Sequence, residues 1–143
     1  MVTRERLLET LNGPWAHYVA AYDALSSDVQ KEYLRRQGYR RFADVLAHIR
    51  AWWLRGRAIV ESLVADPAMA ATEIDVDSFN AAAVADVQAQ TDVEVRSAFE
   101  QARRDMIDLI ERLPPEAFGS ERIVGQLNME IIGHAAEHSL AEY

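Results

Sequence analysis

Apolar residues recur along this chain at alternating steps of three and four, which is the spacing of one buried face of an α-helix. Four such stripes are present, and each is long enough to form one helix of a bundle. They run over residues 8–25, 42–63, 95–113 and 127–141. No segment alternates apolar and polar residues with a period of two, so we expect no β-sheet. The pattern predicts an all-α fold, a four-helix bundle.

Residues that start or stop helices lie at the ends of these stripes. Prolines fit the ends of the second and third helices, at positions Pro67, Pro114 and Pro115. Thr91 and Glu94 have the spacing of a capping box that opens the third helix. Gly119 and Gly125 are expected to bracket a loop before the fourth helix. The Asn12-Gly13-Pro14 sequence predicts a kink or a restart within the first helix.

The links between the predicted helices differ in length. Those after the first and third helices span roughly ten to fifteen residues, whereas the link from Asp66 to Gln90 is long for a structureless loop. Residues 77–84 inside it are expected to form a short helix. A long link can carry the chain back along the bundle, so that the second and third helices run parallel. A short turn at the two prolines would then make the fourth helix antiparallel to the second.

Composition narrows the class of protein and its partners. At 143 residues the chain is most simply a single domain, residues 1–143. No apolar run could span a membrane and the first residues lack a signal-peptide core, so we expect a cytoplasmic protein. A net charge of −8 argues against nucleic acid or an anionic membrane as a partner. The absence of cysteine excludes disulfides, thiolate ligands and a cysteine nucleophile.

Three histidines are the candidates for chemistry. His134 and His138 are four residues apart, so they face the same way from a helix, at seam positions where apolar residues are expected. Buried imidazoles are costly unless something satisfies them. If the second and fourth helices are antiparallel, His48 lies level with this pair and can complete a metal site with an open position. Three imidazoles suit zinc, nickel, copper or ferrous iron, and ligand type does not choose among them. Zinc or nickel is the expected ion.

Acidic residues near these histidines are candidates for a fourth ligand or a general base. Glu142 lies one turn beyond His138 on the expected helix and can serve as either. Glu137 is a second, weaker candidate for the base. Asp44 lies one turn before His48 and is expected to orient its ring. Glu130 is also near the histidines in sequence. The alternative interpretation of each of these acids is a solvated helix face.

Three short segments resemble the DinB-like superfamily, which includes YfiT-type and ClbS/DfsB-type four-helix bundle proteins. The resemblance rests on Asp44-Val45-Leu46-Ala47-His48 with Trp52, on Phe79-Asn80, and on Gly133-His134 through His138. It implies an up-down-down-up bundle, commonly a homodimer, with a divalent metal bound by His48, His134 and His138. A second register found in the family places the metal on His48, His138 and Glu142 instead.

Members of this superfamily include transferases and isomerases that use a low-molecular-weight thiol, and proteins that protect against reactive small molecules. The resemblance thus implies a metal-dependent transferase or hydrolase acting on a small molecule, with a thiol supplied by a cofactor. One alternative is a non-catalytic protein whose aromatic residues line a ligand pocket: Trp15, Tyr18, Tyr22, Trp52 and Trp53. Another is a purely structural dimeric bundle, for which Trp53 beside Trp52 indicates a surface that takes a partner.

Overall fold

The computed structural model describes residues 1–143 and consists of helices joined by turns and loops, with no β-strand. The elements are α1 (Arg4–Asn12), α2 (Pro14–Asp23), α3 (Ser27–Gln37), α4 (Phe42–Ala65), α5 (Val76–Ala85), α6 (Asp92–Arg112), a 3-10 turn (Pro115–Gly119), α7 (Glu121–Leu127), a π-helical segment (Asn128–Gly133) and α8 (His134–Glu137). The all-α prediction is therefore confirmed. None of these helices combines the length and the apolar character that crossing a membrane requires.

The first predicted helix is in fact two helices, which meet at Gly13 and Pro14. Proline has no backbone N–H to donate within a helix, so it is tolerated at the first position of α2 but not inside a continuous helix. Thr3 caps the start of α1 by accepting a hydrogen bond from the backbone N–H of Arg6. The predicted restart at this sequence is confirmed.

The link after α2 contains a helix, α3, that the apolar spacing did not predict. Ser26 caps its start by accepting the backbone N–H of Val29, and Gly38 ends it in the left-handed conformation, with φ of 80°. Tyr33 is its one buried residue, so α3 has too narrow an apolar face to produce a stripe. Its last residue, Gln37, nevertheless reaches the histidines.

The second and third predicted helices end close to the expected residues. α4 ends at Ala65, two residues before Pro67, and α6 ends at Arg112, just before the two prolines. Thr91 and Glu94 form the predicted capping box at the start of α6. The short helix expected in the long link is also present, as α5.

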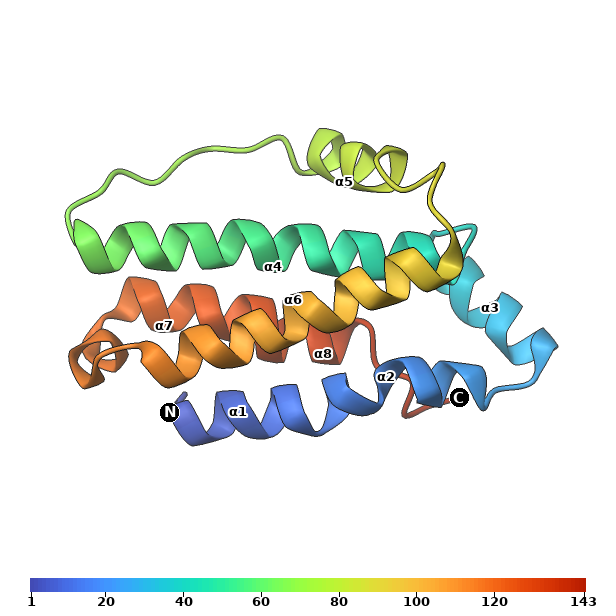
Figure 1. Cartoon of the computed structure of the whole chain (residues 1–143), viewed down its shortest axis with the longest axis horizontal. Coiled ribbons are helices and arrows are strands. Elements are labelled where there is room, and N and C mark those ends of the chain that lie inside the picture. Colours follow the sequence, from blue (N-terminus) through green and yellow to red (C-terminus); the bar gives the residue numbers. More distant parts are fainter.

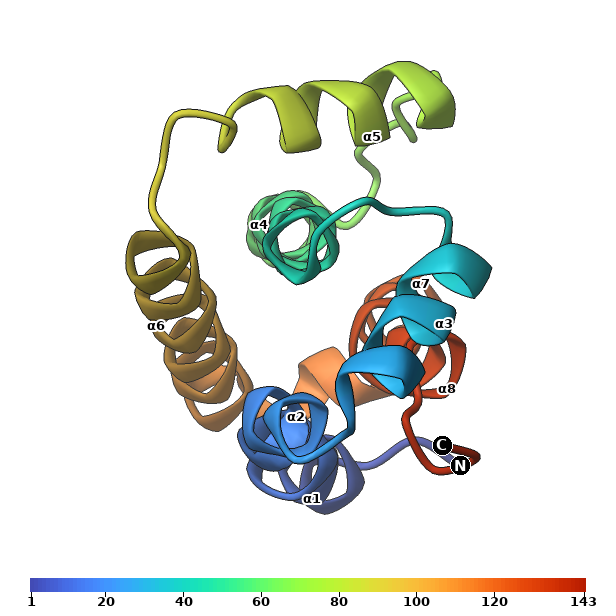
Figure 2. The same ribbon diagram turned by 90° about the vertical axis from the view of Figure 1, so that its right-hand side faces the viewer.

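The helices pack side by side along one long axis (Figure 1). α4 and α6 run in the same direction, whereas α1, α2 and the α7–α8 region run in the opposite direction. Seen end-on, these helices surround a common centre, and α5 lies outside them, across α4 (Figure 2). The long link therefore carries the chain back along α4, as its length suggested.

The fourth predicted helix starts earlier and is less regular than expected. Ser120 caps α7, which begins at Glu121, so Gly125 lies inside a helix and not in a loop. After α7 the chain passes through residues Asn128–Gly133, hereafter the π-segment, before the single turn of α8. A π-helix bonds each residue five positions back, so apolar steps of three and four do not reveal it.

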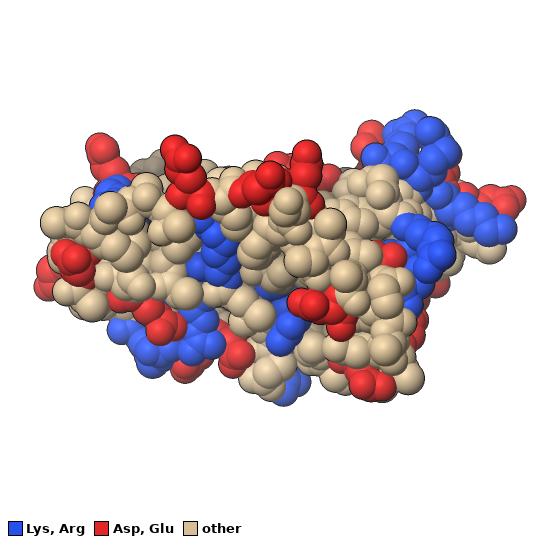
Figure 3. Space-filling model, turned by 90° about the horizontal axis from the view of Figure 1, so that it is seen from above, with Lys and Arg blue, Asp and Glu red and all other residues tan.

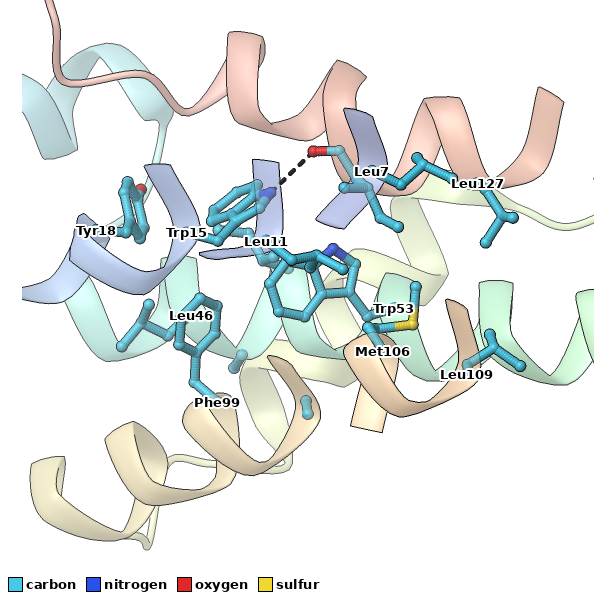
Figure 4. Packing of buried hydrophobic residues seen from close by; sticks show 14 of the residues in the cluster. Leu7, Leu11, Trp15, Tyr18, Leu46, Trp53, Phe99, Met106, Leu109 and Leu127 are labelled. Atoms are coloured by element: carbon cyan, nitrogen blue, oxygen red, sulfur yellow. Dashed lines mark hydrogen bonds between the residues drawn. The ribbon is translucent and has the colours of Figure 1, made fainter. Parts of the chain in front are cut away.

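Large aromatic side chains form the centre of the core (Figure 4). Trp15 and Trp53 meet edge-to-face with ring centroids 5.0 Å apart, and Phe99 stacks on Trp53 at 5.2 Å. Trp53 is 0% exposed. The expectation that Trp53 marks a partner-binding surface is therefore wrong. Trp52, the next residue along, is half-buried on a different face of α4.

Charges of both signs are interspersed on the face that carries α5 (Figure 3). Basic side chains are most prominent at the end of the molecule where α3 lies. There Arg35 and Arg36 share the carboxylate of Glu32, at 2.7 and 3.1 Å. These are exposed pairs within one helix and solvent screens them, so each contributes little to stability.

Candidate metal centre

The three predicted histidines come together between α4 and the C-terminal helix. His48 projects from the first part of α4, His134 opens α8, and His138 directly follows it. One ring nitrogen of each lies within 4.8 Å of those of the other two, and all three residues are buried. Zinc–nitrogen bonds of about 2.0–2.1 Å place tetrahedral ligands roughly 3.4 Å apart. A modest closing of the rings would bring all three nitrogens onto one ion.

Asn80 of α5 orients the ring of His48. Its side-chain oxygen lies 3.0 Å from Nδ1 of His48 and accepts the indole N–H of Trp52 at 2.7 Å. An indole nitrogen can only donate, so the end of the amide that faces both rings is the oxygen. That oxygen requires a hydrogen on Nδ1 of His48. Nε2 of His48 therefore keeps the lone pair that a metal needs.

Gln37, at the end of α3, orients His138 in the same way. Its side-chain oxygen lies 2.7 Å from Nδ1 of His138, while its nitrogen donates to the backbone carbonyl of Glu137 at 3.1 Å. The second bond again determines which end of the amide meets the imidazole. Nε2 of His138 is then a buried acceptor with no hydrogen-bond partner. A bound cation would satisfy this nitrogen, so the donor set fits a divalent ion.

His134 has a different environment from the other two. Its Nδ1 is buried without a hydrogen-bond partner, and it lies 3.9 Å from Oε2 of Glu130. That oxygen is also buried and unpartnered, in a residue that is only 1% exposed. Burial raises the pKa of Glu130 to about 8. Two unpaired polar atoms thus face each other beside the histidine cluster.

Burial keeps the three imidazoles neutral. It lowers the pKa of His48 and His134 below the usual 6.5, and repulsion from His134 adds to the effect at His48. The pKa of His138 falls to about 3 because of burial and of repulsion from the other two imidazoles. Neutral imidazole is the form that binds a metal, because a proton otherwise occupies the coordinating nitrogen.

The acidic candidates do not lie where the sequence predicted them. The last helix ends at Glu137, so Glu142 is not one turn beyond His138 on a helix face; it lies on an exposed C-terminal turn. The expected position of Glu142 is therefore wrong, and the structure groups His134, not Glu142, with the other two histidines. Glu137 is exposed on α8, and its charge raises the pKa of His48 against the larger effect of burial.

Asp44 is buried but does not orient His48. Its carboxylate accepts hydrogen bonds from Arg41 at 2.8 Å and from the side chain of Gln88 at 3.1 Å. The prediction of an acidic partner for His48 is wrong because the amide of Asn80 occupies that position. Asp44 instead joins the start of α4 to the end of the long link.

The π-segment owes its position to two buried indoles. Trp53 donates its N–H to the backbone carbonyl of Glu130, and Trp15 donates to that of Ile131, both at 2.8 Å (Figure 4 shows the bond of Trp15). In a π-turn some backbone carbonyls no longer accept the regular hydrogen bond of an α-helix. In the core these carbonyls need side-chain donors instead. These two bonds hold the backbone immediately before His134.

The aromatic residues proposed to line a ligand pocket belong mostly to the core. Four of them are at most 6% exposed and pack against one another or against Phe42 and Phe99: Trp15, Tyr18, Tyr22 and Trp53. Trp52 alone lies at the histidine site, where its ring also contacts that of Phe79, 4.5 Å between centroids.

A surface hollow of about 590 Å³ adjoins the histidine cluster. It is lined by Gln37 and Asn80, the residues that hold His138 and His48. Tyr39 also lines it, and its ring centroid lies 5.4 Å from that of His48. Arg40 contributes a cation to the same wall. A small molecule entering this hollow would lie against the residues that orient two of the three histidines.

Of the three polar residues that surround the histidines, no signal in the sequence pointed to Gln37, and only partial signals pointed to Asn80 and Glu130. Gln37 lies on a helix that the apolar pattern did not predict, so no spacing pointed to it. Asn80 was noted only as part of a resemblance. Glu130 precedes His134 by four residues, the same step that separates His134 from His138. Glu130 is one of the acids noted near the histidines in sequence, and its alternative interpretation as a solvated helix face is wrong, because the residue is only 1% exposed.

In comparisons with known proteins, no family model, no curated protein and no solved structure matches this chain. The functional argument therefore rests on the geometry of the histidines and of the residues that hold them.

Proposed function

We propose that this protein is a metal-dependent enzyme of the DinB-like type, in which His48, His134 and His138 bind one divalent ion. The observation that carries the proposal is the pairing of two imidazoles with amide oxygens. Nδ1 of His48 and Nδ1 of His138 are both held in this way, so Nε2 of each ring is available to an ion. The buried, unpartnered Nε2 of His138 supports the same interpretation.

Zinc or nickel is the expected ion, and its three imidazole ligands would leave a position for water or for a substrate thiolate. The chain itself provides orientation, through Asn80 and Gln37, and a low-dielectric setting, through burial. Glu137, whose charge acts on His48, is the candidate base at the edge of the site. We propose a small-molecule substrate and a low-molecular-weight thiol as cofactor, for transferase or detoxification chemistry.

The proposal includes the fold and assembly that the resemblance implies. The helix directions in Figure 1 support an up-down-down-up four-helix bundle with a long crossover between its second and third helices. The homodimer rests on the resemblance, and the cytoplasmic location rests on composition alone.

Elemental analysis of the purified, tag-free protein tests the metal site. We expect about one divalent ion per chain in the wild type, and loss of the ion in the His48→Ala and His138→Ala variants. His17→Ala is the matched control, because His17 is exposed on α2 and bonds only its own helix, at the carbonyl of Gly13. A wild type that takes up no zinc or nickel on incubation overturns the proposal.

A structural role without a metal is the second candidate function. The observation that favours it is that the bonds of His48 to Asn80 and of His138 to Gln37 also attach α5 and α3 to the rest of the bundle. Under this alternative, His134→Leu stabilises the fold, because it replaces a buried polar ring with an apolar side chain, and no metal is lost. Under the metal proposal the same variant loses the ion.

A further inference from the structure

Glu130 is a carboxyl group placed in a helix interface, where such a group is rarely found. It lies in the π-segment, is 1% exposed, and packs against α4 at Gly56. A Cβ at Gly56 would lie 2.6 Å from Cγ of Glu130, so the absence of a side chain there makes room for the carboxyl. Burial of an acid is costly unless its oxygens are satisfied, so this arrangement calls for a partner.

Only one of the two side-chain oxygens of Glu130 has a hydrogen-bond partner. Gln126 donates its side-chain N–H to Oε1 at 3.1 Å. Oε2 is buried and unpartnered, and it lies 3.9 Å from Nδ1 of His134, which is buried and unpartnered as well. A small rotation of either side chain would bring the two atoms to hydrogen-bonding distance, about 2.7–2.9 Å.

The arrangement repeats what the other two histidines show. Asn80 and Gln37 each present an oxygen to Nδ1 of an imidazole, and a second bond at the other end holds each amide in place. Glu130 has the same features: Oε1 is held by Gln126 and Oε2 faces Nδ1 of His134. Its carboxylate does not belong to the group of converging ring nitrogens, so it would act through His134 and not as a ligand.

We propose that Glu130 is a positioning residue that accepts the Nδ1–H of His134 and thereby directs Nε2 of this ring to the metal. The inference rests on the proposed function, because it assumes that the histidines bind an ion. It also gives the buried acid a role, because its carboxylate charge would offset part of the charge of a divalent ion once three neutral imidazoles hold one.

The test compares zinc affinity with the stability of the metal-free protein, in wild type and Glu130→Gln. The dissociation constant for zinc is measured by competition with a chelator. We expect Glu130→Gln to bind zinc about 10–100-fold more weakly, because the amide places an NH₂ donor where one of the two carboxylate oxygens lies and removes the charge that strengthens the bond to His134. The melting temperature without metal should stay the same or rise, because a buried acid has been removed. Glu121→Gln, an exposed acid on α7, is the charge-matched control and should leave zinc affinity unchanged.

The outcomes separate the two hypotheses. A wild type that binds no zinc overturns the proposed function and the role of Glu130 together. A wild type that binds zinc, with Glu130→Gln binding equally well, overturns the role of Glu130 alone. If the variant does not fold, nitrogen-15 NMR of the zinc-loaded wild type decides the matter. We expect a protonated Nδ1 and a metal-bound Nε2 at His134, and a metal bound through Nδ1 would contradict the proposal.

Discussion

Trp52 and Trp53 are neighbours in α4, yet they lie on different faces and meet different kinds of partner. Trp53 is fully buried among the aromatic rings of the core, and its indole donates to a backbone carbonyl of the π-segment. Trp52 is half-buried, and its indole donates to the side chain of Asn80 on α5. One face of α4 is thus held mainly by apolar packing and the other by polar contacts with distant segments.

This difference indicates that one face of α4 contributes mainly to stability and the other mainly to binding. On the core face, α4 packs against helices whose apolar stripes are visible in the sequence. On the site face, its partners come from α5 and from the end of α3, outside the four stripes. Changes on the core face should therefore lower the free energy of unfolding, while changes on the site face should mainly weaken metal binding.

The largest expected effect is that of Trp53→Ala. Removing a fully buried indole leaves a large cavity, so we expect a loss of about 3–5 kcal/mol in the free energy of unfolding, measured by urea denaturation. Trp52→Ala is the matched variant, and half-burial should make its loss clearly smaller. Equal losses in the two variants would contradict the division between the faces.

Asn80→Ala tests the site face. We expect zinc affinity to fall about 10–100-fold, because His48 loses the oxygen that orients it. The free energy of unfolding should fall by about 1–3 kcal/mol, because the bonds from both His48 and Trp52 are lost, which is less than expected for Trp53→Ala. Ser78→Ala, at an exposed position of the same helix, serves as control and should leave zinc binding unchanged. Undiminished zinc affinity in Asn80→Ala would show that His48 does not depend on this amide.

Gly56→Ala tests the contact between α4 and the π-segment. Because the new Cβ would lie 2.6 Å from Cγ of Glu130, we expect overpacking to destabilise the fold by about 1–3 kcal/mol. Gly125→Ala, at an exposed position in α7 where a Cβ meets nothing within 4 Å, should instead stabilise it by about 0.5–1 kcal/mol. In a Glu130→Ala background most of the Gly56→Ala loss should disappear, and an unchanged loss would refute the steric explanation.

The smallest expected effect is that of Trp52→Phe, which keeps an aromatic ring near Phe79 but removes the five-membered ring of the indole with the N–H that Asn80 accepts. We expect thermal denaturation to show a loss of about 0.5–1.5 kcal/mol. Trp53→Phe should cost more, about 1–3 kcal/mol, because it leaves the carbonyl of Glu130 buried without a donor. The reverse order would mean that the polar bond at the site matters more to folding than the one in the core.

Much of the helical framework was predictable because apolar periodicity reports a single buried face. This holds for α4 and α6, whose ends also carry clear stop and start signals, and for the restart at Pro14. α3 was missed because one buried tyrosine makes no periodic pattern. The π-segment was missed because its period differs from the one that was sought. That error also placed Glu142 on a helix that ends before it.

The sequence by itself determined that the chain forms helices, and it identified the three histidines that converge. Both follow from local information, namely residue spacing and the cost of polar groups on an apolar face. Only the tertiary structure decided how each imidazole is oriented. The amide that orients His48 lies 32 residues away along the chain, and the one that orients His138 lies 101 residues away. A hydrogen bond depends on the distance and angle between two atoms in space, which the order of residues along a chain does not contain.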